Sequence, residues 1–104
     1  PLTIIYPEAK NLANNLLAED KSIGIRVTEE TFSKTLCERF KKPIVSTSAN
    51  ISNTKAPENF NEISDEIKEN VDYIVQYRQK EKKKNTASSI IKISQNNIIS
   101  IIRK

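Results

Sequence analysis

A cluster of small hydrogen-bonding side chains follows a short apolar run near the middle of the sequence. Residues 43–45 (Pro-Ile-Val) predict a short buried strand, and Ser46, Thr47, Ser48 and Asn50 come directly after it. In an extended backbone alternate positions face the same way, so Ser46, Ser48 and Asn50 would point together. Phosphate oxygens accept hydrogen bonds and lack donors, and ligands of α/β sheets bind at the carboxyl ends of strands. The pattern therefore predicts a phosphate site, the alternative being a polar turn whose hydroxyls bond their own backbone.

The elements before this cluster alternate between strand and helix. Residues 2–6 and 23–27 are apolar and β-branched, which predicts two strands. A helix is predicted to begin at Pro7, a residue suited to the first helical turn. A second helix is predicted from Thr28 as N-cap, with an apolar stripe at i, i+4 and i+8. That stripe consists of Phe32, Leu36 and Phe40.

After the cluster the pattern turns from helix to strand. A loop over 51–59 is followed by a helix for which Asn59 and Glu62 form a capping pair. Alternation over 71–75 predicts a strand, and residues 88–93 and 98–102 predict two more, joined by a hairpin turn at Asn96-Asn97. Helices alternating with strands, then adjacent strands, indicate an α/β (α+β) domain with a mixed sheet.

Composition limits the class of protein. The 104 residues, 37% hydrophobic with one glycine, predict a single globular domain with a modest core. No apolar stretch reaches the roughly 18 residues of a membrane span. The single cysteine, Cys37, excludes an internal disulfide and fits a reducing cytoplasm. Without histidine, a transition-metal site is not expected.

The basic character is local. The net charge of +4 arises between residues 78 and 84, where Lys82, Lys83 and Lys84 are consecutive, and the rest of the chain is neutral. Such a run is usually a solvated loop, but it can also hold phosphates or nucleic acid.

Several stretches resemble the carboxyl-terminal half of the threonylcarbamoyl-adenylate synthase (YrdC-like) domain, in the family's order. Residues 46–52 resemble its Ser-Thr-Ser-Ala-Asn-Leu-Ser, the most specific of the matches. Residues 1–3 (Pro-Leu-Thr), 24–27 (Gly-Ile-Arg-Val) and 71–75 (Val-Asp-Tyr-Ile-Val) resemble further family stretches, as do 88–91 and 101–103. Together they cover essentially the whole chain.

The resemblance implies a YrdC-like twisted sheet with flanking helices and an activity. That activity condenses L-threonine, bicarbonate and ATP to threonylcarbamoyl-AMP and pyrophosphate, for the N6-threonylcarbamoyl modification of adenosine 37 in tRNA. It also implies Mg²⁺ accompanying ATP, the tRNA-modification machinery as partner, and no membrane. The residues implied to bind the nucleotide and its phosphates are Arg26, Ser46, Ser48, Asn50, Ser88 and Arg103. No direct metal cluster and no covalent catalytic residue are implied.

The sequence also departs from the family. The amino-terminal half, with a Lys-x-Arg phosphate-binding motif, is not among these residues, so we expect residues 1–104 to be a partial domain, inactive in isolation. Asn53 stands where the family has glycine, and Ala87 and Ser89 stand where it has proline and threonine. The alternative function is a double-stranded RNA or tRNA-binding module without synthase activity, with Lys82, Lys83 and Lys84 as its contacts.

Overall fold

The computed structural model describes all of residues 1–104 and divides them into two compact units. The first unit comprises Pro1–Pro43 and Ala87–Lys104, and the second comprises Ile44–Thr86. None of the helices is long and apolar enough to cross a membrane.

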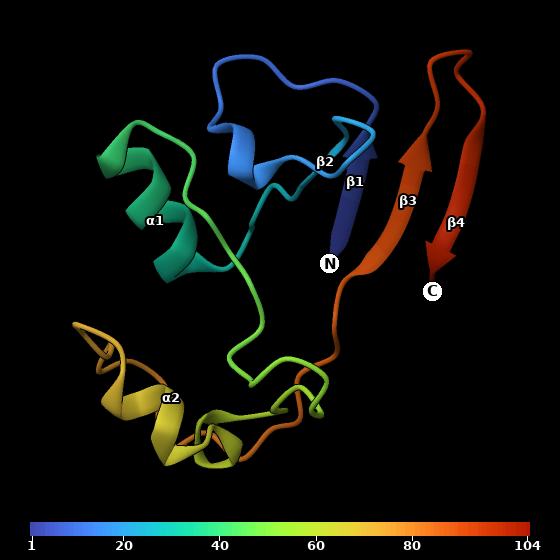
Figure 1. The fold of residues 1–104 in the computed structure, drawn as a ribbon. Helices are drawn as coiled ribbons and strands as arrows, with labels where there is room; N and C mark the ends of the chain where they lie inside the picture. Colours follow the sequence, from blue (N-terminus) through green and yellow to red (C-terminus); the bar gives the residue numbers. More distant parts are fainter. The chain divides into compact units, whose positions relative to one another are not determined.

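The first unit is built on a four-stranded mixed sheet (Figure 1). Its strands are β1 (Leu2–Tyr6), β2 (Ile23–Ile25), β3 (Ser89–Ile93) and β4 (Ile99–Arg103), in the spatial order β2-β1-β3-β4. β1 runs parallel to β3 and antiparallel to β2, and β4 is antiparallel to β3. Four strands predicted from the sequence are thus present, and the predicted mixed α+β class is confirmed.

The register gives the sheet two different faces. Ile4 pairs with Ile25 and Ile91, and Ile91 pairs with Ile101, so one row of isoleucines crosses all four strands. The next row, on the opposite face because successive side chains alternate, consists of Gly24, Ile5, Lys92 and Ser100. We call the first of these faces the isoleucine face. Its members are Leu2, Ile4, Tyr6, Ile23, Ile25, Ser89, Ile91, Ile93, Ile99 and Ile101.

No apolar side chain in the chain is fully buried. The one buried residue is Ser22, with 5% of its surface accessible, and its hydroxyl donates to Asp20 Oδ1 over 2.5 Å. Helix α1 (Thr31–Phe40) does not pack extensively on the sheet of its own unit. The predicted modest core is therefore wrong for these residues, because no second layer covers the apolar side chains of the sheet.

Helix α1 begins three residues after the predicted N-cap. The carboxylate of Glu30, not the hydroxyl of Thr28, accepts hydrogen bonds from the backbone N–H groups of Phe32 and Ser33, at 3.2 and 2.8 Å. The helix ends as expected before Pro43, with Lys41 in the left-handed region at φ 58° and its N–H bonded to Cys37 O. A carboxylate at the N-cap also interacts favourably with the positive end of the helix dipole, which explains the choice of Glu30.

The β3–β4 hairpin follows the prediction. Asn97 has φ 61°, its N–H donates to Ser94 O over 2.9 Å, and Ser94 N–H donates to Ile98 O over 3.0 Å. The Ser94 hydroxyl also bonds Asn96 Oδ1. Asparagine tolerates a positive φ, so the turn forms with no glycine.

The helix predicted from Pro7 is replaced by irregular backbone with one 3₁₀ turn, η1 (Asn14–Leu16). Asn11 has φ 59°, which no right-handed helix accommodates. Three asparagines in this segment are weak helix formers, so the apolar spacing was not enough to form a helix.

Two predicted strands, 43–45 and 71–75, are also absent. Their apolar residues are largely exposed, with Val45 at 69% and Tyr73 at 75% of their accessible surface. A strand requires a neighbour that takes its N–H and C=O groups, and the sheet contains only β1 to β4. Neither segment has such a neighbour among these residues.

The second unit contains η2 (Phe60–Glu62) and α2 (Asp65–Glu69) in place of one predicted helix. The Asn59 side chain does not cap, and the Glu62 carboxylate instead accepts from Glu58 N–H over 2.9 Å. Ser64 caps α2 by accepting from Ile67 N–H over 3.4 Å. A serine followed by two acidic residues is a strong helix start, which explains why the helix begins later than predicted.

Candidate functional site

The hydroxyl segment 46–50 lies in the second unit in irregular backbone. Ser46, Thr47 and Ser48 are exposed, and Asn50 is half-buried. None of the three hydroxyls forms a hydrogen bond with the chain, although a polar turn satisfying itself was the alternative prediction. These hydroxyls therefore face solvent and can donate to an anion.

Asn50 has a different role from its neighbours, because its amide is fixed by the following loop. Its Nδ2 donates to Ile51 O and to Thr54 O, each over 3.0 Å. The Thr54 hydroxyl donates to Ile51 O over 2.6 Å and closes the same turn. Asn50 Oδ1 is buried and has no hydrogen-bond partner. An unpaired amide oxygen is suited to a donor or a hard cation such as Mg²⁺, and not to a phosphate oxygen.

The loop after this segment accommodates the replacement of the family's glycine by Asn53. Asn53 has φ 66°, in the left-handed region that glycine adopts most easily and asparagine tolerates. Thr54 N–H donates to Ile51 O over 3.0 Å across the turn. The substitution therefore keeps the backbone conformation that a glycine would permit.

In the first unit, Ser88 and Arg103 lie in direct contact. Arg103 Nη2 and Nε donate to Ser88 O over 2.6 and 2.9 Å, and Nη2 lies 3.5 Å from Ser88 Oγ. The guanidinium is thus held at the end of β4 instead of fraying with the terminus. Arginine carries five N–H donors, so its Nη1 group still has donors for an anion.

Thr3 contacts Ser88 and so joins the pair formed by Ser88 and Arg103. It was not among the site residues predicted from the sequence. The Thr3 and Ser88 hydroxyls share a hydrogen bond of 2.7 Å. Parallel pairing of Leu2 with Ser89 brings these residues together from opposite ends of the chain. Only that strand register could have indicated the contact, because nothing in the local sequence around Thr3 does.

Arg26, the remaining predicted residue, is exposed just beyond β2 and forms no ion pair with Glu29. Arg26, Ser88 and Arg103 belong to the first unit, and the hydroxyl segment belongs to the second. A hollow of about 520 Å³ in the first unit contains none of them. Its lining residues are Glu8, Ala9, Asn14, Leu17, Ala18 and Lys21.

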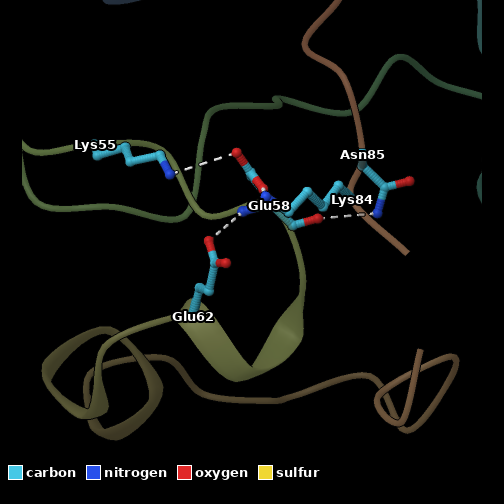
Figure 2. Close-up of polar contacts among 5 residues, drawn as sticks. All are labelled: Lys55, Glu58, Glu62, Lys84 and Asn85. Carbon is cyan, nitrogen blue, oxygen red and sulfur yellow. Dashed lines mark hydrogen bonds and ion pairs between the residues drawn. The ribbon is translucent and has the colours of Figure 1, made fainter. Parts of the chain in front are cut away.

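The lysine run is tied to Glu58 within the second unit (Figure 2). Glu58 Oε2 lies 3.3 Å from Lys84 Nζ, and its Oε1 lies 3.4 Å from Lys55 Nζ. The backbone N–H and Nδ2 of Asn85 both donate to Glu58 O, at 3.0 and 3.2 Å. The Lys84 ammonium, followed by that of Lys55, holds the pKa of the Glu58 carboxyl below its usual value.

Only one of the three lysines predicted to contact RNA forms an ion pair. Lys84 is engaged by Glu58, whereas Lys82 and Lys83 are exposed without an ion pair. No group of three histidine, cysteine, aspartate or glutamate side chains that could hold a metal ion occurs in the structure. Any Mg²⁺ here would accordingly be held mainly by the phosphates and water that accompany it.

The four-stranded mixed sheet with few helices and the Ser46–Asn50 segment define a YrdC-like α+β domain. The chain belongs to the Sua5_yciO_yrdC family, described as "Telomere recombination", whose profile matches residues 1–104. The predicted family is therefore confirmed.

Curated relatives carry the name threonylcarbamoyl-AMP synthase. The chain is 36% identical to that of Psychromonas ingrahamii over 70 residues, covering 67% of this chain and 37% of the relative. It is 37% identical to the putative threonylcarbamoyl-AMP synthase of Methanocaldococcus jannaschii over 101 residues, covering 97% of this chain and 45% of the relative. The chain thus spans less than half the length of these relatives. No solved structure matches it significantly, and none of these names favours the RNA-binding alternative.

Proposed function

We propose that these residues form the phosphate-binding part of a threonylcarbamoyl-AMP synthase. The reaction joins L-threonine, bicarbonate and ATP, releases water and pyrophosphate, and yields threonylcarbamoyl-AMP for the modification of tRNA adenosine. The match of the whole chain to the family, together with curated relatives of that name, carries the proposal.

The proposed chemistry begins with the threonine amine and bicarbonate, which condense to a carbamate with loss of water. A carbamate oxygen then attacks the α-phosphorus of ATP, and the bond to the β-phosphate oxygen breaks to release pyrophosphate. The protein forms no covalent bond to the substrate in this scheme. Its contribution is to orient the triphosphate and to stabilise the charge that develops on the phosphate oxygens.

The described side chains have the donors that this task needs. In the second unit, the exposed Ser46 and Ser48 hydroxyls would donate to phosphate oxygens. In the first unit, considered by itself, the Arg103 Nη1 group would offer a charge-assisted donor to an anion. Ser88 lies beside Arg103 in that first unit, and exposed Arg26 would be a further cation of the same unit. Asn50 Oδ1, the unpaired acceptor, would face Mg²⁺ or its water.

A chimeric enzyme tests the proposal. Residues 1–104 replace the matching region of the M. jannaschii relative, and pyrophosphate release is measured with and without L-threonine and bicarbonate. We expect release that depends on both substrates, and a loss of at least tenfold in Ser46→Ala/Ser48→Ala. Ser100→Ala, an exposed β4 serine without a side-chain hydrogen bond, is the control and should stay within twofold.

Two results would contradict the proposal in different ways. A folded chimera that binds no ATP would exclude the synthase function for this chain. Full activity of the double serine variant would exclude the site but keep the function. Residues 1–104 alone should release no pyrophosphate, since over half the length of the relatives lies outside the match.

A further inference from the structure

The Thr3 and Ser88 side chains form a pair of hydroxyls on the face of the sheet opposite the isoleucine face. Their oxygens lie 2.7 Å apart, both residues are half-buried, and 85 positions separate them in the chain. Backbone pairing holds the contact, since Leu2 pairs with Ser89 in the parallel register and Ser89 N–H donates to Pro1 O over 2.9 Å. The sheet itself therefore keeps the two hydroxyls together.

Gly24, on the neighbouring strand β2, leaves room for the Thr3 side chain. A Cβ atom added at Gly24 would lie 3.3 Å from Thr3 Cγ2, closer than an ordinary van der Waals contact. Gly24 pairs with Ile5, two residues from Thr3, so it faces the same side of the sheet as Thr3. The Thr3 methyl group thus packs where β2 has no side chain. Because rotation about χ1 is restricted in threonine, this packing directs Oγ1 toward Ser88.

Arg103 approaches the Ser88 side chain as well. Its Nη2 donates to Ser88 O over 2.6 Å and lies 3.5 Å from Ser88 Oγ. A serine hydroxyl has one hydrogen and two acceptor lone pairs. An anion bound at Ser88 accepts that hydrogen, so the Thr3 hydroxyl must then be the donor of the 2.7 Å bond. A hydroxyl that accepts a hydrogen bond also becomes a stronger donor.

We infer that Thr3 is a positioning residue, whose hydroxyl donates to Ser88 Oγ and so directs the Ser88 hydrogen at a bound phosphate group. The inference rests on the proposed function for the role of Ser88. It adds a residue that acts through Ser88 and not on the ligand. The alternative is a structural bond that only joins β1 to the start of β3.

The first test needs no enzymatic activity. In residues 1–104 with Cys37→Ala, the thiol of Ser88→Cys is titrated through its alkylation rate as a function of pH. A hydroxyl donor stabilises a thiolate, so Thr3→Val should raise the pKa of this thiol by about 0.5 or more and slow alkylation at pH 7 roughly threefold. Thr3→Ser should restore both values. The thiol of Ser100→Cys, on exposed β4, is the control and should respond to neither change at Thr3.

The second test uses the chimera described above. Thr3→Val should lower kcat/KM for ATP at least fivefold, mainly by raising KM, and Thr3→Ser should stay within twofold of the unmodified chimera. In a Ser88→Ala background, Thr3→Val should have less than a twofold effect, because no hydroxyl is left for Thr3 to direct. A bond that is only structural would lower kcat through the folded fraction and leave KM unchanged.

Three results would overturn the inference. They are a thiol pKa at position 88 that Thr3→Val leaves unchanged, a loss confined to kcat, and an effect of Thr3→Val that persists in Ser88→Ala. A chimera that releases no pyrophosphate would instead refute the proposed function. The thiol titration would then still show whether Thr3 acts on the side chain at position 88.

Discussion

Arg103 Nη2 donates to the carbonyl oxygen of Ser88 over 2.6 Å, which joins the end of β4 to the residue before β3. A second bond from Nε, at 2.9 Å, makes the contact bidentate. Both residues are among those that the family resemblance implies for phosphate binding, and Arg26 is the third of these in the first unit. This contact holds the Arg103 guanidinium next to Ser88, whose hydroxyl also shares a hydrogen bond with Thr3.

Replacing Arg103 should therefore loosen the hairpin before it affects any ligand. We expect Arg103→Ala to cost about 1 kcal/mol, since the contact is exposed and charge-assisted bonds are stronger only when water is excluded. A loss of that size should make hydrogen exchange of the backbone amides at the end of β4 roughly fivefold faster. Lys104→Ala is the control. Unchanged exchange in Arg103→Ala would show that the bidentate contact is not maintained in solution.

Asn53 should tolerate glycine but not a β-branched residue. Its φ of 66° is open to glycine at no steric cost, so Asn53→Gly should leave the free energy of unfolding within about 0.5 kcal/mol. Asn53→Val should lose about 1–2 kcal/mol, because a Cβ-branched side chain crowds the carbonyl in this region. Urea denaturation followed by circular dichroism measures both. Equal stability of the two variants would show that the turn relaxes out of the left-handed region.

Asp20 should make stability depend on acid pH. Hydrogen bonds from Lys92 and from the Ser22 hydroxyl and N–H strongly lower the pKa of the Asp20 carboxyl. A carboxyl with a lowered pKa stabilises the fold above its ordinary pKa, about 3.9, and this stabilisation is lost as the pH falls through the lower folded value. Asp20→Asn should thus flatten the fall in urea midpoint below about pH 4.

Glu19→Gln is the matched control for Asp20, because Glu19 is the exposed neighbouring carboxyl and forms no ion pair. It should keep the pH profile of the unmodified chain. A profile for Asp20→Asn that overlies that of the unmodified chain would mean that the Asp20–Lys92 contact contributes nothing to stability in solution.

Lys84 should be the lysine of the basic run that controls the titration of Glu58. Lys84→Ala removes the ammonium group that does most to lower the pKa of Glu58, so this pKa should rise toward its ordinary value. Lys83→Ala should leave it unchanged, because Lys83 does not contact Glu58. Carbon-detected NMR titration of the Glu58 carboxyl distinguishes the two. An equal rise in both variants would mean that the overall positive charge of the lysine run lowers this pKa, and not the specific ion pair between Lys84 and Glu58.

The sequence by itself determined the elements whose patterns are strong over a few residues. Four strands, helix α1 with its end before Pro43, and the Asn96-Asn97 turn follow from local preferences. The motif at 46–52 indicated the family without any coordinates, and the profile match confirmed it. Local preference was misleading where apolar residues had no neighbour to pair with, at 43–45 and 71–75.

Only the tertiary structure decided which distant residues meet. The contacts of Ser88 with Thr3 and Arg103, and the isoleucine row across four strands, depend on strand order and register. A shift of one residue in any strand would send its isoleucines to the other face, and no short stretch of sequence specifies that choice. Pairing is fixed by the joint burial and hydrogen bonding of strands far apart in the chain, so the site's neighbours and the uncovered face had to be read from the fold.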